Sequence, residues 1–309
     1  MSKTKKGLFE GVVSFNKQIG ERFYRLGLRF KGEAGKAFAG LVPGQFAEFD
    51  ISTAGLPACG EIPDDLRDSA RRELLLRRPF SFCNVEIDGD EVEVEILYCV
   101  VGAGTIRMTT LAAGDIISVV GPLGNGFSVP ESKSTALLVV GGMGAPPILH
   151  LAKVLKEKHP EIETVGFVGA KSAVDFPLEE IQGQSKDALK SMSDFELNGV
   201  TWQVASDEGD IGHKGFVTEK LEEWLGSCDA QKDTIIIYSC GPAGMLRNTA
   251  AIAERHGVDC QVSMEQMMAC GIGLCQSCAI ECKGDGGTEY KLCCKDGPVF
   301  DSRDVVFKV

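Results

Sequence analysis

Cysteines crowd one short segment of this 309-residue chain, where six of the twelve lie between positions 270 and 294. Three of them form the pattern C-x4-C-x2-C, and further cysteines follow it. This spacing with a distant fourth cysteine is typical of plant-type [2Fe-2S] clusters, in which four thiolates hold two irons. The glycines in the pattern, Gly271 and Gly273, can adopt positive φ and let backbone N–H groups point at the sulfides. The segment is therefore predicted to transfer electrons through an iron-sulfur cluster whose first three ligands are Cys270, Cys275 and Cys278.

Residue types and spacing leave two questions about this segment open. A structural zinc site also uses four cysteines, but zinc knuckles favour repeated C-x2-C pairs, and only one such pair occurs here. An iron-sulfur cluster is therefore the preferred interpretation, and zinc is the alternative. The fourth ligand is not fixed by the spacing, because three cysteines remain: Cys282, Cys293 and Cys294.

The elements that must position this segment fall into three stretches of different periodicity. From Gly11 to about Pro130, short alternating strands separated by Gly, Pro and Asp turns predict an antiparallel barrel or sandwich. After Glu131, apolar runs alternate with helix-like segments, which predicts βαβ units and a parallel sheet. Both periodicities fade beyond about Asp259. The predicted fold class is β plus α/β, with an antiparallel β-barrel domain at 1–132, a parallel-sheet α/β domain at 133–258 and a cluster-binding C-terminal segment at 259–309.

Two motifs at predicted strand ends have the residue types that a flavin site needs. In RRPFSF, at 77–82, an arginine could pair with a pyrophosphate, an aromatic ring could lie on a ring system and a hydroxyl could hydrogen-bond a flavin nitrogen. The turn VGAGT, at 101–105, precedes a helical segment and could offer backbone N–H groups to a phosphate. An ordinary strand-to-helix turn is the alternative for the second motif. The candidate residues are Arg78, Pro79, Phe80, Ser81, Gly102, Gly104 and Thr105.

Two glycine-containing turns in the predicted α/β domain could bind a dinucleotide. The stretch LLVVGGMGAPP, at 137–147, places three glycines between a buried strand and a helix, but its G-G-x-G spacing is not the Rossmann fingerprint. A second turn follows the strand in IIIYSCGPAGML, at 235–246. Both turns lie at the carboxyl edge of a parallel sheet, where open α/β sheets bind their ligands. The candidate residues are Gly141, Gly142, Gly144, Cys240, Gly241 and Gly244.

Composition narrows the range of partners. A net charge of -12 and a pI near 4.9 argue against nucleic acid, since binding a phosphate backbone needs a basic surface. The longest apolar stretch is interrupted by glycines and prolines, so no membrane span is expected. The N-terminal residues lack the apolar core of a secretory signal, so a cytoplasmic location is expected. In that reducing compartment the clustered cysteines indicate a metal or redox centre rather than disulfides.

Together these motifs resemble the ferredoxin-reductase superfamily, and their order resembles the electron-transfer subunits of dihydroorotate dehydrogenase. The resemblance covers nearly the whole chain. It implies an FAD-binding barrel, an NAD-binding α/β domain and one [2Fe-2S] cluster in the C-terminal segment. The residues that carry it are RRPFSF, VGAGT, GPLGNGF at 121–127, VVGGMGAPP, SCGPAGML, MMACGIGLCQSC and CCKDGPVF.

The resemblance also assigns roles to single residues. It implies that Arg78 and Ser81 contact FAD, and that the VGAGT turn lies at the FAD phosphates. It implies that Cys240 lies near the nicotinamide, and that Cys294 is the fourth cluster ligand because the family's last cysteine directly precedes K-D-G-P-V-F. The sequence departs from the family at two places: phenylalanine replaces a common tyrosine at Phe80, and the insertion at 58–76 is longer than usual.

The function implied by the resemblance is electron transfer within an NAD-dependent dihydroorotate dehydrogenase of pyrimidine biosynthesis. Electrons from a separate FMN-containing catalytic subunit would pass through the cluster and FAD to NAD+, and the two subunits would form a heterotetramer. The segment FVGAKSAVDF contains one basic residue, Lys171, which favours NAD over NADP. Two alternatives stay open. One is a flavin and iron-sulfur subunit of another anaerobic complex, such as a ferredoxin:NADP oxidoreductase or a sulfhydrogenase, and the other is a cysteine-zinc interaction module.

Overall fold

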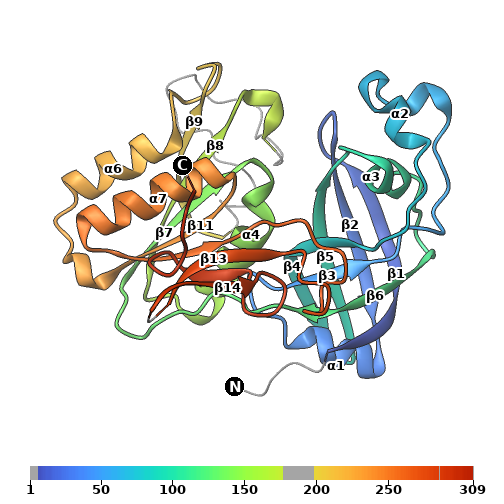
Figure 1. The fold of residues 1–309 in the computed structure, drawn as a ribbon, viewed down its shortest axis with the longest axis horizontal. Helices are drawn as coiled ribbons and strands as arrows, with labels where there is room; N and C mark the ends of the chain where they lie inside the picture. Colours follow the sequence, from blue (N-terminus) through green and yellow to red (C-terminus); the bar gives the residue numbers. More distant parts are fainter. Residues whose placement is uncertain (1–5, 177–197, 285, 309) are drawn as a thin grey trace.

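The computed structural model describes residues 6–176, 198–284 and 286–308, which form two lobes joined by the C-terminal segment (Figure 1). One lobe is an antiparallel barrel and the other is a mostly parallel sheet with helices on both faces. Both predicted architectures are therefore confirmed. None of the helices in the described ranges has both the length and the apolar composition needed to cross a membrane.

Six strands close the barrel in the order β1-β2-β5-β4-β3-β6. In β5, valines and isoleucine are buried while the alternating glutamates Glu91, Glu93 and Glu95 are half-buried, as a period of two requires. The strands are β1 (Gly7–Gln18), β2 (Phe23–Phe30), β3 (Phe46–Phe49), β4 (Arg78–Asp88), β5 (Glu91–Cys99) and β6 (Ile116–Leu123). The barrel lobe also contains α1 (Gly32–Ala39), η1 (Cys59–Glu61), η2 (Asp64–Leu66), α2 (Arg67–Ala70) and α3 (Ala103–Met108).

The insertion at 58–76 holds the short helices η1, η2 and α2 and packs onto the barrel core. Leu66 and Ala70 are buried in that core, and Arg22 makes a two-pronged ion pair with Asp65. The last leucines of the insertion, Leu75 and Leu76, are exposed beside the start of β4.

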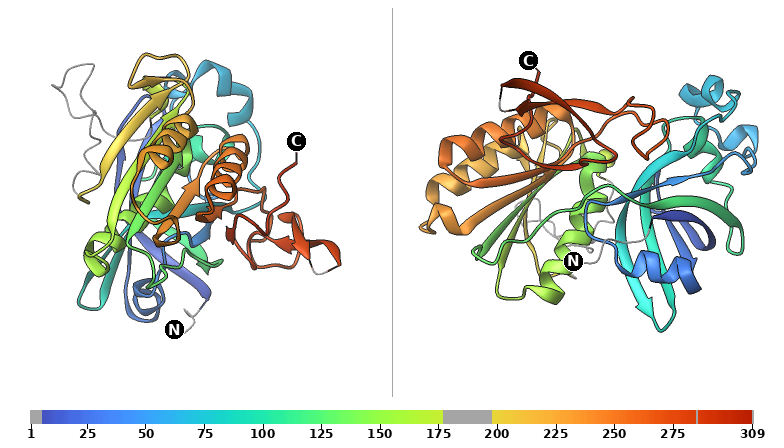
Figure 2. Two further views of the ribbon diagram at one scale, coloured as in Figure 1. Left: turned by 90° about the vertical axis from the view of Figure 1, so that its left-hand side faces the viewer. Right: turned by 60° about the horizontal axis from the view of Figure 1, so that its bottom comes forward.

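Seven strands form the second sheet, in the order β10-β9-β8-β7-β11-β12-β15. Helix α4 covers the face toward the barrel and packs against β4, while α6 and α7 cover the other face (Figure 2). The strands are β7 (Thr135–Gly141), β8 (Glu163–Ala170), β9 (Thr201–Ser206), β10 (His213–Lys214), β11 (Ile235–Cys240), β12 (Asp259–Ser263) and β15 (Val299–Asp301). The helices of this lobe are η3 (Gly142–Gly144), α4 (Ala145–Lys158), η4 (Ala173–Asp175), α6 (Val217–Ser227), η5 (Lys232–Thr234) and α7 (Ala243–His256).

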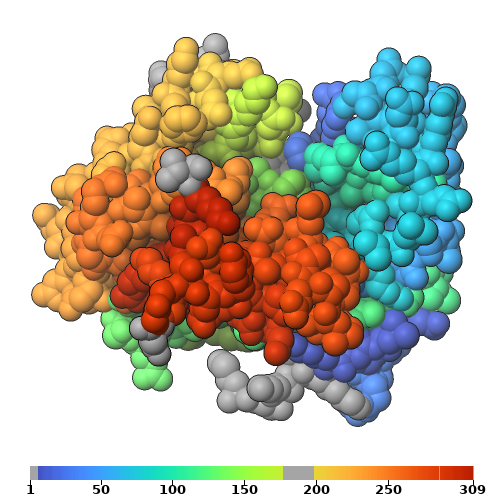
Figure 3. All heavy atoms as spheres, in the orientation of Figure 1, coloured from blue at the N-terminus to red at the C-terminus, as the bar shows by residue number. Residues whose placement is uncertain are grey.

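The C-terminal segment contains more regular structure than its sequence predicts. It forms a hairpin of β13 (Ala279–Gly284) and β14 (Gly287–Leu292), and β15 pairs antiparallel with β12 at the edge of the large sheet. The strands escape prediction because they are short, and because most of β14 is exposed and shows no alternation. The segment lies across the junction of the two lobes and contacts both (Figure 3).

Candidate functional site

A cavity of about 390 Å³ lies where the barrel meets the carboxyl edge of the sheet. Both sides of the junction contribute predicted residues to its wall. The predicted residues that line it are Pro79, Phe80, Ser81, Thr105, Gly144, Cys240 and Gly241. Arg78 lines an adjacent cavity of about 790 Å³, whereas Gly102, Gly104, Gly141 and Gly142 line neither cavity.

The barrel side of the cavity is aromatic. Phe80 makes edge-to-face contacts with Phe49 at 5.5 Å and with Tyr98 at 6.4 Å between ring centroids. Tyr98 also lines the cavity, and its hydroxyl donates to Asn16 Oδ1 at 3.1 Å. Burial raises the pKa of Tyr98, so its hydroxyl stays protonated. Nothing in the sequence marks this tyrosine, because it lies near the end of an ordinary barrel strand.

Arg78 reaches the turn that precedes α3. A Cβ placed on Gly104 would stand 3.2 Å from Arg78 Cγ and 3.3 Å from its Nε, so a glycine allows the guanidinium to approach this turn. Within the turn, Thr105 Oγ1 accepts the N–H groups of Val101 at 2.9 Å and Gly102 at 3.2 Å. The N–H of Gly102 is thus already bonded, and the guanidinium of Arg78, which donates to the backbone carbonyls of Leu76 and Arg77, lies against this turn.

The sheet side of the cavity is built by two turns in direct contact. A Cβ on Gly144 would stand 2.0 Å from the carbonyl oxygen of Cys240, so only glycine permits the two turns to touch. Gly241 has φ +158° and Gly142 has φ +48°. Burial raises the pKa of the Cys240 thiol to about 12, although a hydrogen bond with Ser263 on the neighbouring strand acts in the opposite direction. The thiol is therefore neutral and suited to packing against a ring.

The four predicted cluster cysteines form two pairs. Cys275 N–H donates to Cys270 Sγ at 3.4 Å, and Cys294 N–H donates to Cys278 Sγ at 3.5 Å. A two-iron cluster is held by two cysteine sulfurs on each iron, and two pairs of cysteines supply that set of ligands. A tetrahedral zinc site needs four donors around one point, and no three His, Cys, Asp or Glu side chains of the described ranges converge in that way.

The backbone conformation and the thiol pKa in the cluster loop suit the binding of an iron-sulfur cluster. Gly271 has φ +65° and Gly273 has φ +86°, which glycine adopts without strain. Hydrogen bonds from Ser277 and then from Cys270 lower the pKa of the Cys275 thiol to about 6, so this sulfur is poised as a thiolate. The residues present therefore fit an iron-sulfur cluster.

The two remaining cysteines make other contacts, although Cys293 shares the buried cluster of Cys278 and Cys294. Cys293 is buried, and its thiol donates to the carbonyl oxygen of Met264 at 3.1 Å. Cys282 lies in β13, pairs with Val305 and is buried in the core beneath α6 and α7. Their positions favour Cys294 as the fourth ligand.

Exchanging the two neighbouring cysteines for serine tests that choice. Cys294→Ser is expected to lower the iron content and the visible absorbance of the cluster by at least about tenfold, because one thiolate is lost. Cys293→Ser keeps all four thiolates and a hydroxyl donor for Met264, so it should retain the cluster. Iron analysis of anaerobically purified protein measures both, and the reverse pattern would move the ligand to Cys293.

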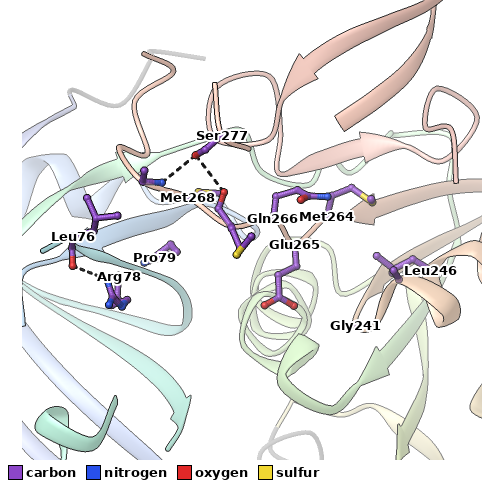
Figure 4. Close-up of a pocket in the computed structure, with 13 residues that line it drawn as sticks. Leu76, Arg78, Pro79, Gly241, Leu246, Met264, Glu265, Gln266, Met268 and Ser277 are labelled. Atoms are coloured by element: carbon purple, nitrogen blue, oxygen red, sulfur yellow. Dashed lines mark hydrogen bonds between the residues drawn. The ribbon is translucent and has the colours of Figure 1, made fainter. Parts of the chain in front are cut away.

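Residues 264–268 lead from β12 to the cluster loop and line the cavities, and of these only Met267 and Met268 belong to a sequence motif, MMACGIGLCQSC. All five line the larger cavity, with Leu76 and Arg78 on the barrel side and Gly241 and Leu246 on the sheet side (Figure 4), and all but Met267 also line the smaller cavity. Met268 also packs against the buried cluster cysteines, and so does Phe46 of β3, which lines the smaller cavity. Three side chains, those of Phe46, Met264 and Met268, therefore line the smaller cavity and also pack in the apolar cluster that holds the buried cysteines.

Two protein-family models match this chain. The iron-sulfur cluster binding domain of dihydroorotate dehydrogenase B matches residues 265–306, and the oxidoreductase NAD-binding domain matches residues 138–251. The electron transfer subunit of dihydroorotate dehydrogenase B (NAD+) from Caldanaerobacter subterraneus is 34% identical over 96% of this chain and 97% of its own length. The corresponding subunit from Bacillus velezensis is 35% identical over 95% of this chain and 97% of its own length.

The chain belongs to the dihydroorotate dehydrogenase B electron transfer subunits. This membership confirms the predicted family, and the two family models confirm the predicted iron-sulfur cluster and NAD. It also confirms that the chain is an NAD-linked oxidoreductase subunit.

Solved structures support the fold of this electron transfer subunit. A chain of an NADH-dependent reduced ferredoxin-NADP oxidoreductase superposes with a TM-score of 0.71 at 24% identity, covering 99% of this chain and 92% of that chain. A ferredoxin NADP+ reductase from Neisseria gonorrhoeae with bound FAD and NADP superposes with a TM-score of 0.53 at 13% identity, covering 81% of this chain and 92% of that chain. At these identities the likeness concerns the fold alone.

Proposed function

We propose that this chain carries electrons between an FMN-containing dihydroorotate dehydrogenase catalytic subunit and NAD+. The supporting observation is that Phe46 and Met268 contact both the cavity between the lobes and the buried cysteines of the cluster loop. When bound, the cluster supplies one-electron transfer, FAD exchanges one or two electrons, and NAD+ accepts a hydride, so two electrons and one proton leave together.

The chain's own residues bind and orient the groups in this scheme. Arg78 is placed to pair with the FAD pyrophosphate, and Phe80, Ser81 and Tyr98 form the barrel wall against which the ring system would lie. Gly144 and Gly241 have no side chains, so they leave room on the sheet side of the cavity for a nicotinamide to enter. The neutral thiol of Cys240 adds a polarisable surface there without a charge.

The partner and the setting belong to the same proposal. The relatives are named as electron transfer subunits, which supports a separate catalytic subunit. We place the two subunits together in a heterotetramer in the cytoplasm, where cysteine thiols stay reduced. The cluster ligands in this proposal are Cys270, Cys275, Cys278 and Cys294.

The test is a reconstitution with the catalytic subunit under anaerobic conditions. Dihydroorotate and NAD+ should yield NADH, followed by its absorbance, only when both subunits are present. The proposal is wrong if the complex oxidises dihydroorotate with artificial acceptors and makes no NADH, or if the isolated chain lacks flavin and iron.

Replacing Arg78 tests the flavin site separately. Arg78→Ala is expected to weaken FAD binding about ten- to hundredfold, because a charge-assisted hydrogen bond to a pyrophosphate is lost. Arg77→Ala is the matched control, since the Arg77 guanidinium is held by Ser118 O at 2.7 Å and Ser118 Oγ at 3.0 Å. Fluorescence titration of the flavin-depleted chain with FAD measures both affinities, and equal losses would remove the special role of Arg78.

A further inference from the structure

Glu48 is a carboxyl buried beneath the cluster loop, and nothing in the electron path described above uses it. It lies on β3 with 1% of its surface exposed. Neither of its carboxylate oxygens has a hydrogen-bond partner among the described residues. A buried carboxyl without hydrogen bonds costs free energy, so such groups are uncommon unless they have a function.

The side chain of Glu48 lies directly against the cluster loop. A Cβ on Gly271 would stand 2.5 Å from Glu48 Cγ and 2.7 Å from its Oε1. Gly271 follows Cys270 immediately, and the Cys275 thiolate is close enough to act on the Glu48 carboxyl electrostatically. The loop backbone and the carboxyl are therefore in van der Waals contact on the side of the Cys270 and Cys275 pair.

The cations near Glu48 are engaged with other groups. Arg77 donates to Ser118 and lies 3.5 Å from Asp50. Arg78 donates to the backbone carbonyls of the two residues before it, at 2.7 and 3.1 Å. Neither guanidinium forms an ion pair with Glu48, so their attraction offsets only part of a charge on this carboxyl.

The balance of these surroundings leaves Glu48 able to carry a charge near neutral pH. Burial raises the pKa of Glu48 to about 7, Arg77 and Arg78 oppose that rise, and Cys275 adds to it. Above that pH the carboxylate is ionised while it stays inside the protein. Charges interact strongly there because the surroundings are poorly polarisable.

We propose that Glu48 sets the reduction potential of the iron-sulfur cluster through its buried negative charge. The one-electron reduction of the cluster adds a negative charge beside this carboxylate. Repulsion between the two charges destabilises the reduced cluster and lowers its potential. The proposal rests on the proposed function, because it presupposes the cluster in this loop.

The test is an EPR-monitored redox titration of the full chain carrying flavin and cluster, at about pH 9, with dithionite as reductant and redox mediators present. Glu48→Gln keeps the shape and removes the charge. It should favour reduction of the cluster by about tenfold in equilibrium constant, which corresponds to a potential about 59 mV higher for a one-electron couple.

Two further variants make the result specific. Glu48→Met is a second neutral variant of similar length, and it should raise the potential in the same direction. Asp88→Asn removes the same charge from the opposite, exposed end of the barrel, since Asp88 ends the eleven-residue strand β4 that starts at Arg78. It should leave the potential within about twofold in equilibrium constant, because a distant exposed charge is screened by solvent.

The outcomes separate this proposal from the proposed function. An unchanged potential in both neutral variants, with the cluster signal retained, overturns the role of Glu48. A shift of equal size in Asp88→Asn also overturns it, because the effect would then belong to net charge. Wild-type protein without iron or a cluster signal would instead count against the proposed function.

Discussion

Cys275→Ser is expected to remove the cluster from this chain while leaving FAD bound. Cys275 is the exposed member of the Cys270 pair, and hydrogen bonds from Ser277 lower its pKa and so favour the thiolate that binds metal. The flavin residues lie on the barrel, so they should not be disturbed. NADH formation from dihydroorotate in the reconstituted complex should fall at least about a hundredfold, since losing a ligand costs more than losing a supporting residue.

The measurement combines iron content, flavin absorbance and the coupled rate on one preparation. Cys59→Ser is the control, because Cys59 is an exposed thiol in the insertion of the barrel lobe. This substitution should leave the iron content, the flavin absorbance and the coupled rate unchanged. A Cys275→Ser variant that keeps full coupled activity would show that electrons do not pass through the cluster loop.

Gly144→Val is expected to disable the nucleotide side of the site and spare the rest. Its Cβ would stand 2.0 Å from the carbonyl oxygen and 2.3 Å from the carbonyl carbon of Cys240, and backbone atoms cannot yield as a side chain can. The start of α4 must therefore move away from β11, which displaces the surface that receives the nicotinamide. Displacements of about 1 Å can cost about a hundredfold in rate, so kcat/KM for NAD+ should fall by about that factor.

The control for this variant is Gly226→Ala, because a Cβ on Gly226 in the last turn of α6 meets no atom within 4 Å. Iron and FAD contents should match the wild type in both proteins. Steady-state kinetics with NAD+ then isolates the nucleotide side. Normal kcat/KM in Gly144→Val would contradict the contact between the two turns.

Local patterns made most of the fold and the cluster predictable. The alternation in β5 is visible because one face of that strand is buried and the other is not. The cysteine cluster is visible because six cysteines, the four proposed ligands among them, lie between positions 270 and 294. The paired turns at Gly144 and Cys240 follow from the rule that parallel strands present their carboxyl ends at one edge.

Contacts between distant parts of the chain were not predictable in the same way. Phe46 and Met268 lie far apart in sequence, and each resembles an ordinary core residue until the fold brings them together at the cysteines. Tyr98 occupies a routine position in a barrel strand. Glu48 interrupts an apolar strand, but only the packing of Gly271 against it shows which group it faces.

The proposed function depends most on the electronic connection between the cluster loop and the flavin cavity. Adding excess NADH anaerobically to the isolated chain, with EPR and flavin absorbance recorded on the same sample, tests this connection directly. NADH delivers electrons only at the nucleotide side, so the account predicts that flavin bleaching is accompanied by a reduced-cluster signal of about one spin per chain. A sample in which dithionite reveals a cluster that NADH never reduces, although the flavin bleaches, would contradict it.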